Sequence, residues 1–251
     1  MCIRDRDGNR PRPLPMALGH EASGIVEQVG EGVTDIAVGD QVTTVFLPRC
    51  EDCANCATNG KLPCTPGTET NNAGLLPGST LRLHRDGQDV HHHLGVSGFA
   101  SHAVVSRQSV VPVGADVPPE IAAVVGCAVL TGGGAVLNAG RPSDGDTVIV
   151  VGLGGVGMAA LLTALSLQKG PVIGVDANPE KLARARELGA SAVYTPDELA
   201  DNGVRADVVV EAAGHPHAFE SAVASTAPGG TTVTVGLPSP DARSTIAPLG
   251  L

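Results

Sequence analysis

The chain has 251 residues, of which 42% are hydrophobic and 17% charged, and its formal net charge is −10. The apolar content predicts a folded protein, because a disordered chain has fewer apolar residues. The length is enough for one large domain or two ordinary ones. The negative charge and the scarcity of aromatic residues (one Tyr, three Phe and no Trp) argue against a nucleic-acid partner. Such partners require basic residues for the phosphates or aromatic platforms for the bases.

The longest apolar run lies around Met158–Leu167 and is shorter than a membrane span. The polar, charged N-terminus shows no signal-peptide pattern. We therefore expect a soluble, cytoplasmic protein with no membrane partner. In chain order, the first predicted elements are short strands within residues 16–45, where apolar stretches alternate with Gly and Asp turns. This pattern is typical of an all-β region.

A cluster of cysteines follows the predicted β region. Four of the six cysteines fall within the stretch CEDCANCATNGKLPC, at Cys50, Cys53, Cys56 and Cys64. In a chain without a secretion signal, this spacing indicates metal binding rather than disulfides. Four thiolates favour a closed, tetrahedral structural zinc site. The alternatives are free surface thiols or an iron–sulfur centre, although the stretch lacks the regular spacing and trailing Pro of the bacterial ferredoxin pattern.

Three further groups of residues carry metal-binding side chains. The triplet His91-His92-His93 is expected on a surface loop. Taken alone, His20 is most simply a hydrogen-bonded structural histidine, and Cys127, in an apolar stretch, an inert core thiol.

The second half of the chain contains a dinucleotide-binding pattern. A predicted strand at 147–151 leads into Gly152-Leu153-Gly154-Gly155-Val156-Gly157, and a predicted helix at 156–169 follows. The next strand, at 171–175, ends at Asp176, nineteen residues after Gly157. Gly152 permits the turn, Gly154 lets the backbone approach a pyrophosphate, and Gly157 allows close helix packing. Asp176 favours NAD over NADP, because it accepts hydrogen bonds from the ribose hydroxyls and repels a 2′-phosphate.

The alternation of strands and helices continues to the end of the chain. We expect a helix at 180–188, strands at 191–194 and 206–211, a helix at 217–225 and a strand at 230–235. These make five strands of a doubly wound parallel sheet, whose usual order is 3-2-1-4-5-6. Because no sixth strand follows in this sequence, the strand at 230–235 is expected to be an apolar edge of the sheet.

These motifs together resemble the zinc-containing medium-chain alcohol dehydrogenases. Gly19-His20-Glu21-x-x-Gly24, then Gly30 and Val33, match the family signature; the cysteine cluster, the stretch GCAVLTGGGAVL (126–137) and the GLGGVG turn follow in the family's order. The resemblance implies an α/β protein with a GroES-like β domain at 1–128 and a doubly wound NAD-binding (Rossmann) domain at 129–251. It also implies that the sequence lacks both termini of the family, including the last strand of the sheet, and that residues 1–6 are not native sequence.

The resemblance assigns roles to individual residues. His20 and Cys127 match ligands of the catalytic zinc, Glu21 matches a carboxylate behind the metal, and Thr131 matches a threonine of the nicotinamide pocket. The family's remaining catalytic cysteine has no match, and Cys2 is a poor substitute. Residues implied in NAD binding are Gly152, Gly154, Gly155, Val156, Gly157, Asp176, Lys181, Val235 and Leu237.

The implied function is oxidation of a primary or secondary alcohol to an aldehyde or ketone by hydride transfer to NAD, with one catalytic and one structural zinc in each intact chain. Two alternatives stay open. One is a dehydrogenase of S-(hydroxymethyl)glutathione in the same family, and the other is an inactive protein that keeps the structural zinc and binds NAD. An enzyme should carry two zinc ions per chain and an inactive binder one. The resemblance also implies a homodimer or homotetramer.

Overall fold

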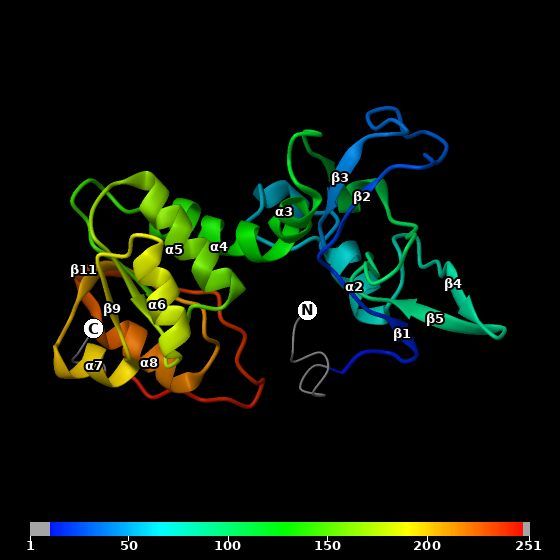
Figure 1. Cartoon of the computed structure of the whole chain (residues 1–251). Helices are drawn as coiled ribbons and strands as arrows, with labels where there is room; N and C mark the ends of the chain where they lie inside the picture. Colours follow the sequence, from blue (N-terminus) through cyan, green and yellow to red (C-terminus); the bar gives the residue numbers. More distant parts are fainter. Residues whose placement is uncertain (1–10, 248–251) are drawn as a thin grey trace. The chain divides into compact units, whose positions relative to one another are not determined.

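The structure of the protein is a computed structural model, which describes residues 11–247. The chain divides into two compact units, Met1–Cys127 and Ala128–Leu251 (Figure 1). The sequence analysis places the boundary one residue later. Each unit contains its own sheets and its own clusters of buried apolar side chains.

Short strands dominate the first unit. One sheet has the order β1 (Met16–Ala17), β5 (Gln88–His92), β4 (Leu83–Arg85), and the other has the order β2 (Ser23–Ile25), β3 (Gln41–Thr44), β6 (Val110–Pro112). The β-rich character expected of this region is therefore confirmed. The small core beside the second sheet contains Ile36, Val42 and Val110.

Helical segments of the first unit connect these strands. They are the turn η1 (Cys56–Thr58), helix α2 (Thr65–Ala73), the turn η2 (Arg107–Ser109) and helix α3 (Pro119–Val124). Cys64 caps the start of helix α2, where its sulfur accepts a hydrogen bond from the N–H of Gly67, and Gly74, in the left-handed conformation, caps its end. A sulfur acceptor at the first turn and a left-handed glycine at the end set the length of this helix.

A helical run continues from α3 across the boundary between the units. It consists of η3 (Val125–Val129), α4 (Leu130–Gly134) and η4 (Ala135–Gly140). Two glycines of this run pack closely, one within each unit. A methyl group on Gly126 would overlap the carbonyl oxygen of Thr44, and one on Gly132 would overlap that of Val156. Each glycine thus allows close contact between helix and backbone within its own unit.

This run corrects one expectation from the sequence. Among the described residues, Pro119–Gly140 is the helical run that is long and apolar enough, by length and composition only, to cross a membrane, and 28% of its most apolar window is buried. The expected longest apolar segment, in α5 (Gly155–Leu167), is shorter. The sequence analysis was wrong here because glycines interrupt the apolar run without ending the helix. One such helix is weak evidence for a membrane span, since core helices pass the same test.

The second unit is built on a five-stranded parallel sheet. Its order is β11 (Thr226–Thr234), β10 (Ala206–Glu211), β7 (Val148–Val151), β8 (Val172–Val175), β9 (Ala192–Tyr194). In order of appearance along the chain this is 5-4-1-2-3, which confirms the predicted doubly wound topology.

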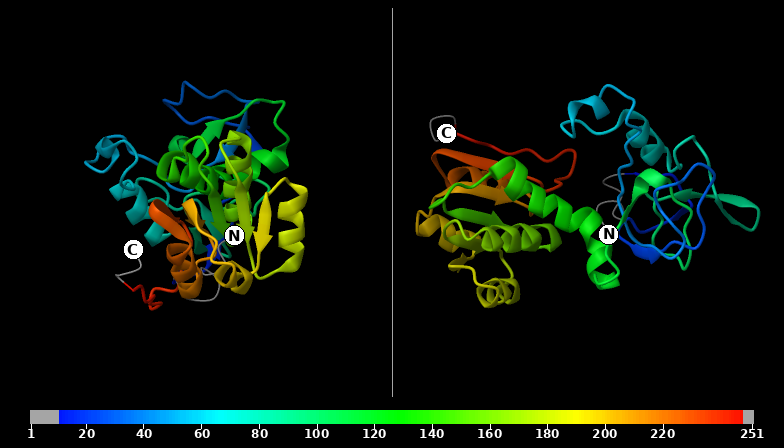
Figure 2. Two further views of the ribbon diagram at one scale, coloured as in Figure 1. Left: turned by 90° about the vertical axis from the view of Figure 1, so that its left-hand side faces the viewer. Right: turned by 90° about the horizontal axis from the view of Figure 1, so that it is seen from above.

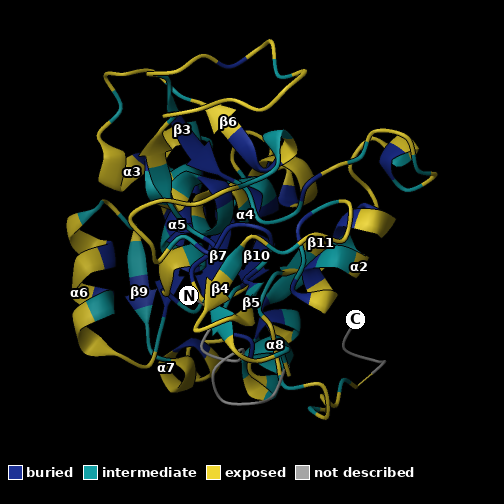
Figure 3. Ribbon diagram, turned by 90° about the vertical axis from the view of Figure 1, so that its right-hand side faces the viewer, coloured by how far each residue is buried: buried dark blue, intermediate teal, exposed yellow. Residues whose placement is uncertain are grey.

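Helices cover both faces of this sheet (Figures 1 and 2). Alternate residues of β7 show why. Val148 and Val150 join one core with residues of α5 and α6 (Pro179–Glu187), whereas Ile149 and Val151 join the other with residues of α7 (Pro196–Asp201) and α8 (Pro216–Ala224). Because both faces are buried, the strand is apolar at every position. Strands β7 and β10 are accordingly among the most buried parts of the chain (Figure 3).

Two details of the second unit differ from the sequence prediction. Helix α7 was not predicted, although Thr195 and Glu198 form a capping box at its start, a pattern that the sequence shows as Thr-Pro-Asp-Glu. Strand β11 is an edge strand but begins at Thr226 and contains four threonines, so the expectation of an apolar edge was wrong.

Candidate functional site

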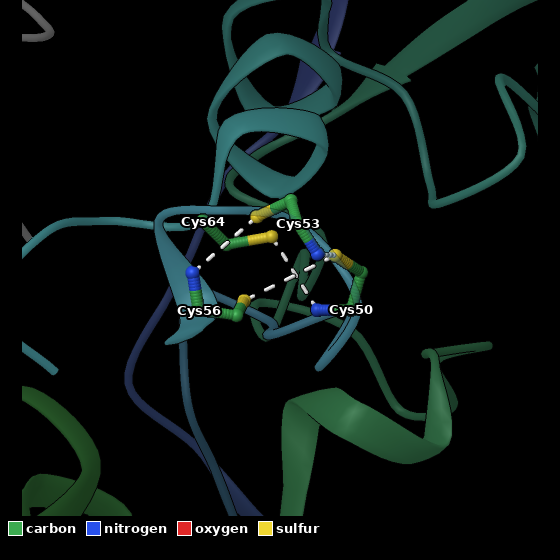
Figure 4. Close-up of side chains that lie close together, drawn as sticks. All are labelled: Cys50, Cys53, Cys56 and Cys64. Atoms are coloured by element: carbon green, nitrogen blue, oxygen red, sulfur yellow. Dashed lines mark hydrogen bonds between the residues drawn. The ribbon is translucent and has the colours of Figure 1, made fainter. Parts of the chain in front are cut away.

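The four clustered cysteines converge on a common point. Their sulfur atoms all lie within 4.8 Å of one another, and the four side chains point toward one another (Figure 4). The sulfurs of Cys50 and Cys56 are 3.9 Å apart. Four cysteine sulfurs at this spacing fit a tetrahedral zinc ion.

Backbone N–H groups hold these sulfurs in place. Cys53 N–H donates to the sulfur of Cys50 at 3.4 Å, and Cys56 N–H donates to that of Cys53 at 3.4 Å. The sulfur of Cys64 accepts from Cys50 N–H at 3.3 Å and from Gly67 N–H at 3.4 Å. N–H groups directed at sulfur stabilise thiolates, which are the form that binds metal.

The thiols respond differently to their surroundings. The N–H groups of Cys56 and Thr65 lower the pKa of the Cys53 thiol to about 6. Burial raises the pKa of Cys64, against the N–H groups of Cys50 and Gly67. A buried thiol with a raised pKa becomes a thiolate when a cation binds it, so this cluster can hold a metal that displaces its protons.

A second pair of metal-binding side chains comes from residues far apart in the sequence. The Nε2 atom of His20 lies 3.4 Å from the sulfur of Cys127. His20 follows β1 and is 6% exposed, and Cys127 lies in η3. Gly19 has a φ of +100°, and a side chain there would meet the backbone of Phe99. A glycine therefore has to precede His20 for the chain to turn it toward Cys127.

Two aromatic rings flank His20. The Phe46 ring lies edge-on at 5.7 Å between centroids, and the His93 ring at 5.3 Å. The expectation that His91-His92-His93 forms a surface loop was wrong, since His92 is 1% and His93 0% exposed. The reason is that His91 and His92 belong to strand β5, which pairs with β1 and β4. The apolar residues Val90, Leu94 and Val96 around the triplet were the available sequence signal.

The other residues assigned by resemblance to the metal site lie in different places. Glu21 is half-buried next to His20 in the sequence, and Thr131 is half-buried in α4 of the second unit. Cys2 and residues 1–6 lie outside the described residues.

The glycine turn of the second unit has the geometry that its pattern predicts. Gly152 has a φ of +90° and packs against the backbone of Ala213. A methyl group on Gly157 would overlap the carbonyl oxygen of Gly152, whereas one on Gly154 would meet nothing within 4 Å. Helix α5 begins at Gly155 and continues through Val156. The turn therefore leaves room at Gly154, in front of a helix N-terminus, which fits the phosphates of a dinucleotide.

Asp176 lies directly after β8, beside this turn. It accepts hydrogen bonds from the N–H groups of Leu153 (2.7 Å) and Asn178 (2.8 Å) and from the ammonium of Lys181 (3.2 Å). Burial acts to raise the pKa of Asp176, but these three donors outweigh it and hold the pKa below the usual value. Asp176 is thus a fixed carboxylate at neutral pH.

Val235 and Leu237 follow the end of β11. Val235 N–H donates to the carbonyl of Glu211 at 2.9 Å, which ties this segment to the end of β10. Leu237 is 46% exposed, and its backbone is in contact with Gly214. Both residues therefore lie at the carboxyl edge of the sheet, the edge at which doubly wound proteins bind their ligands.

Two family models match most of the chain, one in each half. The alcohol dehydrogenase GroES-like domain matches residues 2–115, and the zinc-binding dehydrogenase domain matches residues 155–251. A zinc-binding alcohol dehydrogenase domain protein from Burkholderia ambifaria is 30% identical, with a TM-score of 0.90 over 99% of this chain and 69% of its own. The chain belongs to the zinc-binding alcohol dehydrogenase family. These proteins are oxidoreductases, and NAD is their typical coenzyme.

Other members of the family are also similar to this chain. Alcohol dehydrogenase class-3 of Drosophila melanogaster is 35% identical over 236 residues, which are 89% of this chain and 62% of the relative. Benzyl alcohol dehydrogenase of Acinetobacter calcoaceticus is 28% identical, with a TM-score of 0.86 over 100% of this chain and 70% of its own. The chain thus spans about two thirds of the length of these relatives.

Proposed function

We propose that this chain is part of a zinc-dependent dehydrogenase that oxidises a primary or secondary alcohol with NAD. The observation that carries the proposal is the approach of His20 Nε2 to the sulfur of Cys127, at 3.4 Å. An imidazole and a thiolate are ligands that zinc prefers, and catalytic zinc sites leave one position open for substrate. When bound, the zinc would polarise the alcohol oxygen as a Lewis acid, and NAD would accept the hydride.

The chain's own residues would orient the reactants and exclude water. His20 is buried with the rings of Phe46 and His93 edge-on to it, and these rings would hold the imidazole in place and exclude water. In the second unit, the turn at Gly154 would approach the pyrophosphate, and Asp176 would accept a hydrogen bond from a hydroxyl of the adenosine ribose. The three donors on Asp176 leave one further acceptor position for this contact.

The same carboxylate supports NAD rather than NADP as the coenzyme. A 2′-phosphate beside Asp176 would place two negative charges together, with Lys181 already paired to the carboxylate. Replacement of Asp176 by Ser should therefore narrow the preference for NAD over NADP. A preference that stays the same in Asp176→Ser would contradict the role given to this residue.

Formation of NADH with a panel of primary, secondary and benzylic alcohols tests the proposal. The Cys127→Ser variant should lose turnover and keep NAD binding, because NAD contacts are assigned to the second unit. Ala123→Ser, four residues earlier in the same helical run, is the matched control and should keep turnover. A protein that binds NAD and zinc but oxidises no alcohol would be the inactive binder instead, and loss of NAD binding in Cys127→Ser would contradict the site assignment.

A further inference from the structure

One buried polar side chain joins helix α2, which Cys64 caps, to the segment that carries Phe46. Asn71 is in helix α2 and is 4% exposed. Its Nδ2 donates a hydrogen bond of 2.6 Å to the carbonyl oxygen of Phe46. A carbonyl oxygen can only accept, so the amide must present its nitrogen there and its oxygen on the other side.

The helix that carries Asn71 is fixed by the cysteine cluster. Its first turn is held by the hydrogen bond from Gly67 N–H to the sulfur of Cys64. Gly67 also packs so closely on Pro48 that a methyl group would overlap the Pro48 carbonyl oxygen. Asn71 follows Gly67 by one helical turn and lies on the same face. A metal bound by Cys64 therefore fixes the position from which Asn71 reaches Phe46.

Asn71 binds one of the two segments that place rings against His20 and lies near the other. Phe46, whose carbonyl it binds, has its ring edge-on to His20. The Asn71 oxygen lies 3.5 Å from the position that a methyl group on Gly95 would take. Gly95 belongs to the turn that follows His93, in which the N–H groups of Val96 and Ser97 donate to the His93 carbonyl.

We propose that Asn71 is a positioning residue that couples the metal-binding cysteine cluster to the His20–Cys127 site. Its amide holds the Phe46 backbone and lies near the turn after His93, and so it sets the two rings that orient the His20 imidazole. The inference rests on the proposed function, because His20 needs a defined orientation only if it binds a metal.

Matched substitutions on one helix test this coupling. Asn71→Leu removes the donor, and Asn71→Asp keeps the shape but sets a carboxylate oxygen against the Phe46 carbonyl. The neighbouring Asn72 is exposed, so Asn72→Leu and Asn72→Asp are the controls. All variants should retain zinc in the cysteine cluster, which verifies the fold of the first unit.

The readout is the NMR signal of the His20 ring, identified by its loss in His20→Gln. Both Asn71 variants should shift this signal, because aromatic rings displaced next to an imidazole change its magnetic environment, whereas both Asn72 variants should leave it in place. A residue with a purely structural role would lower the melting temperature without this selective shift. An unmoved His20 signal in the Asn71 variants, or equal shifts in the Asn72 variants, would overturn the proposal.

Zinc retention separates this inference from the proposed function. The zinc ion that wild type holds and Cys127→Ser lacks is the ion of the His20–Cys127 site. Asn71→Leu should weaken the zinc affinity of this site about 10-fold, which is the low end of the effect for residues that orient metal ligands. If wild type and Cys127→Ser hold equal zinc, the proposed function fails. If the site binds zinc equally in Asn71→Leu and Asn72→Leu, only the role of Asn71 is overturned.

Discussion

At the scale of single residues, a substitution at Gly154 should change ligand binding without changing the stability of the fold. A methyl group there meets no protein atom within 4 Å, but it would occupy the space through which the backbone approaches a pyrophosphate. Gly154→Ala should therefore weaken NAD binding about 10-fold, a loss of about 1.4 kcal/mol, and leave the melting temperature unchanged. Calorimetric titration with NAD measures the first effect. Gly157→Ala is the contrasting variant, because its methyl group overlaps Gly152 and should destabilise the unit.

Asp176 makes the stability of the second unit depend on pH. Its pKa in the folded chain is lowered from 3.8, so its contribution is fully present above that value and is lost as the pH falls through the folded pKa. Asp176→Asn should cost about 1–2 kcal/mol at pH 7, since hydrogen bonds to a charged acceptor are lost. Denaturant unfolding of both proteins should show this difference unchanged down to about pH 5 and shrinking below about pH 4. A difference that grows on acidification would contradict the assignment.

At the scale of elements, the consecutive glycines of α4 have opposite roles. Gly132 packs against Val156 with no room for a methyl group, whereas a methyl group on Gly134 would meet only Asn138, at 3.7 Å. Gly132→Ala should destabilise the protein by about 1–3 kcal/mol through overpacking. Gly134→Ala should stabilise it by about 0.5–1 kcal/mol, because alanine loses less backbone entropy in a helix. Thermal unfolding of the two variants shows whether each is less or more stable than wild type. Equal changes in stability would show that the close packing at Gly132 is unimportant.

Most elements of the second unit were predictable because they depend on local sequence. The apolar run of β7 and the glycine turn before α5 are contiguous patterns, and the structure confirms the fold they predict. The burial of His92 and His93 depends instead on pairing of β5 with β1, more than seventy residues earlier in the chain. The neighbouring Val90, Leu94 and Val96 were a local signal of burial, but no local pattern shows which distant strand β5 pairs with.

At the scale of the whole molecule, the candidate metal sites and the candidate NAD site lie in different units. The first contains the cysteine cluster and the His20–Cys127 pair, and the second contains the glycine turn and Asp176. His20 and Cys127 are separated by 107 positions. Their proximity was expected only from the resemblance to a family, because no spacing rule relates residues so far apart. The Phe46 ring beside His20 and the hydrogen bond from Asn71 to the Phe46 carbonyl had no sequence signal.

The zinc content of the purified protein tests the central claim most directly. We predict about two zinc ions per chain in wild type and about one in Cys127→Ser, as expected for one catalytic and one closed structural site. Cys64→Ser should lose the other zinc, and Ala123→Ser should keep both. One zinc per chain in wild type, with the same amount in Cys127→Ser, would contradict the account and leave a zinc-stabilised protein without a catalytic metal.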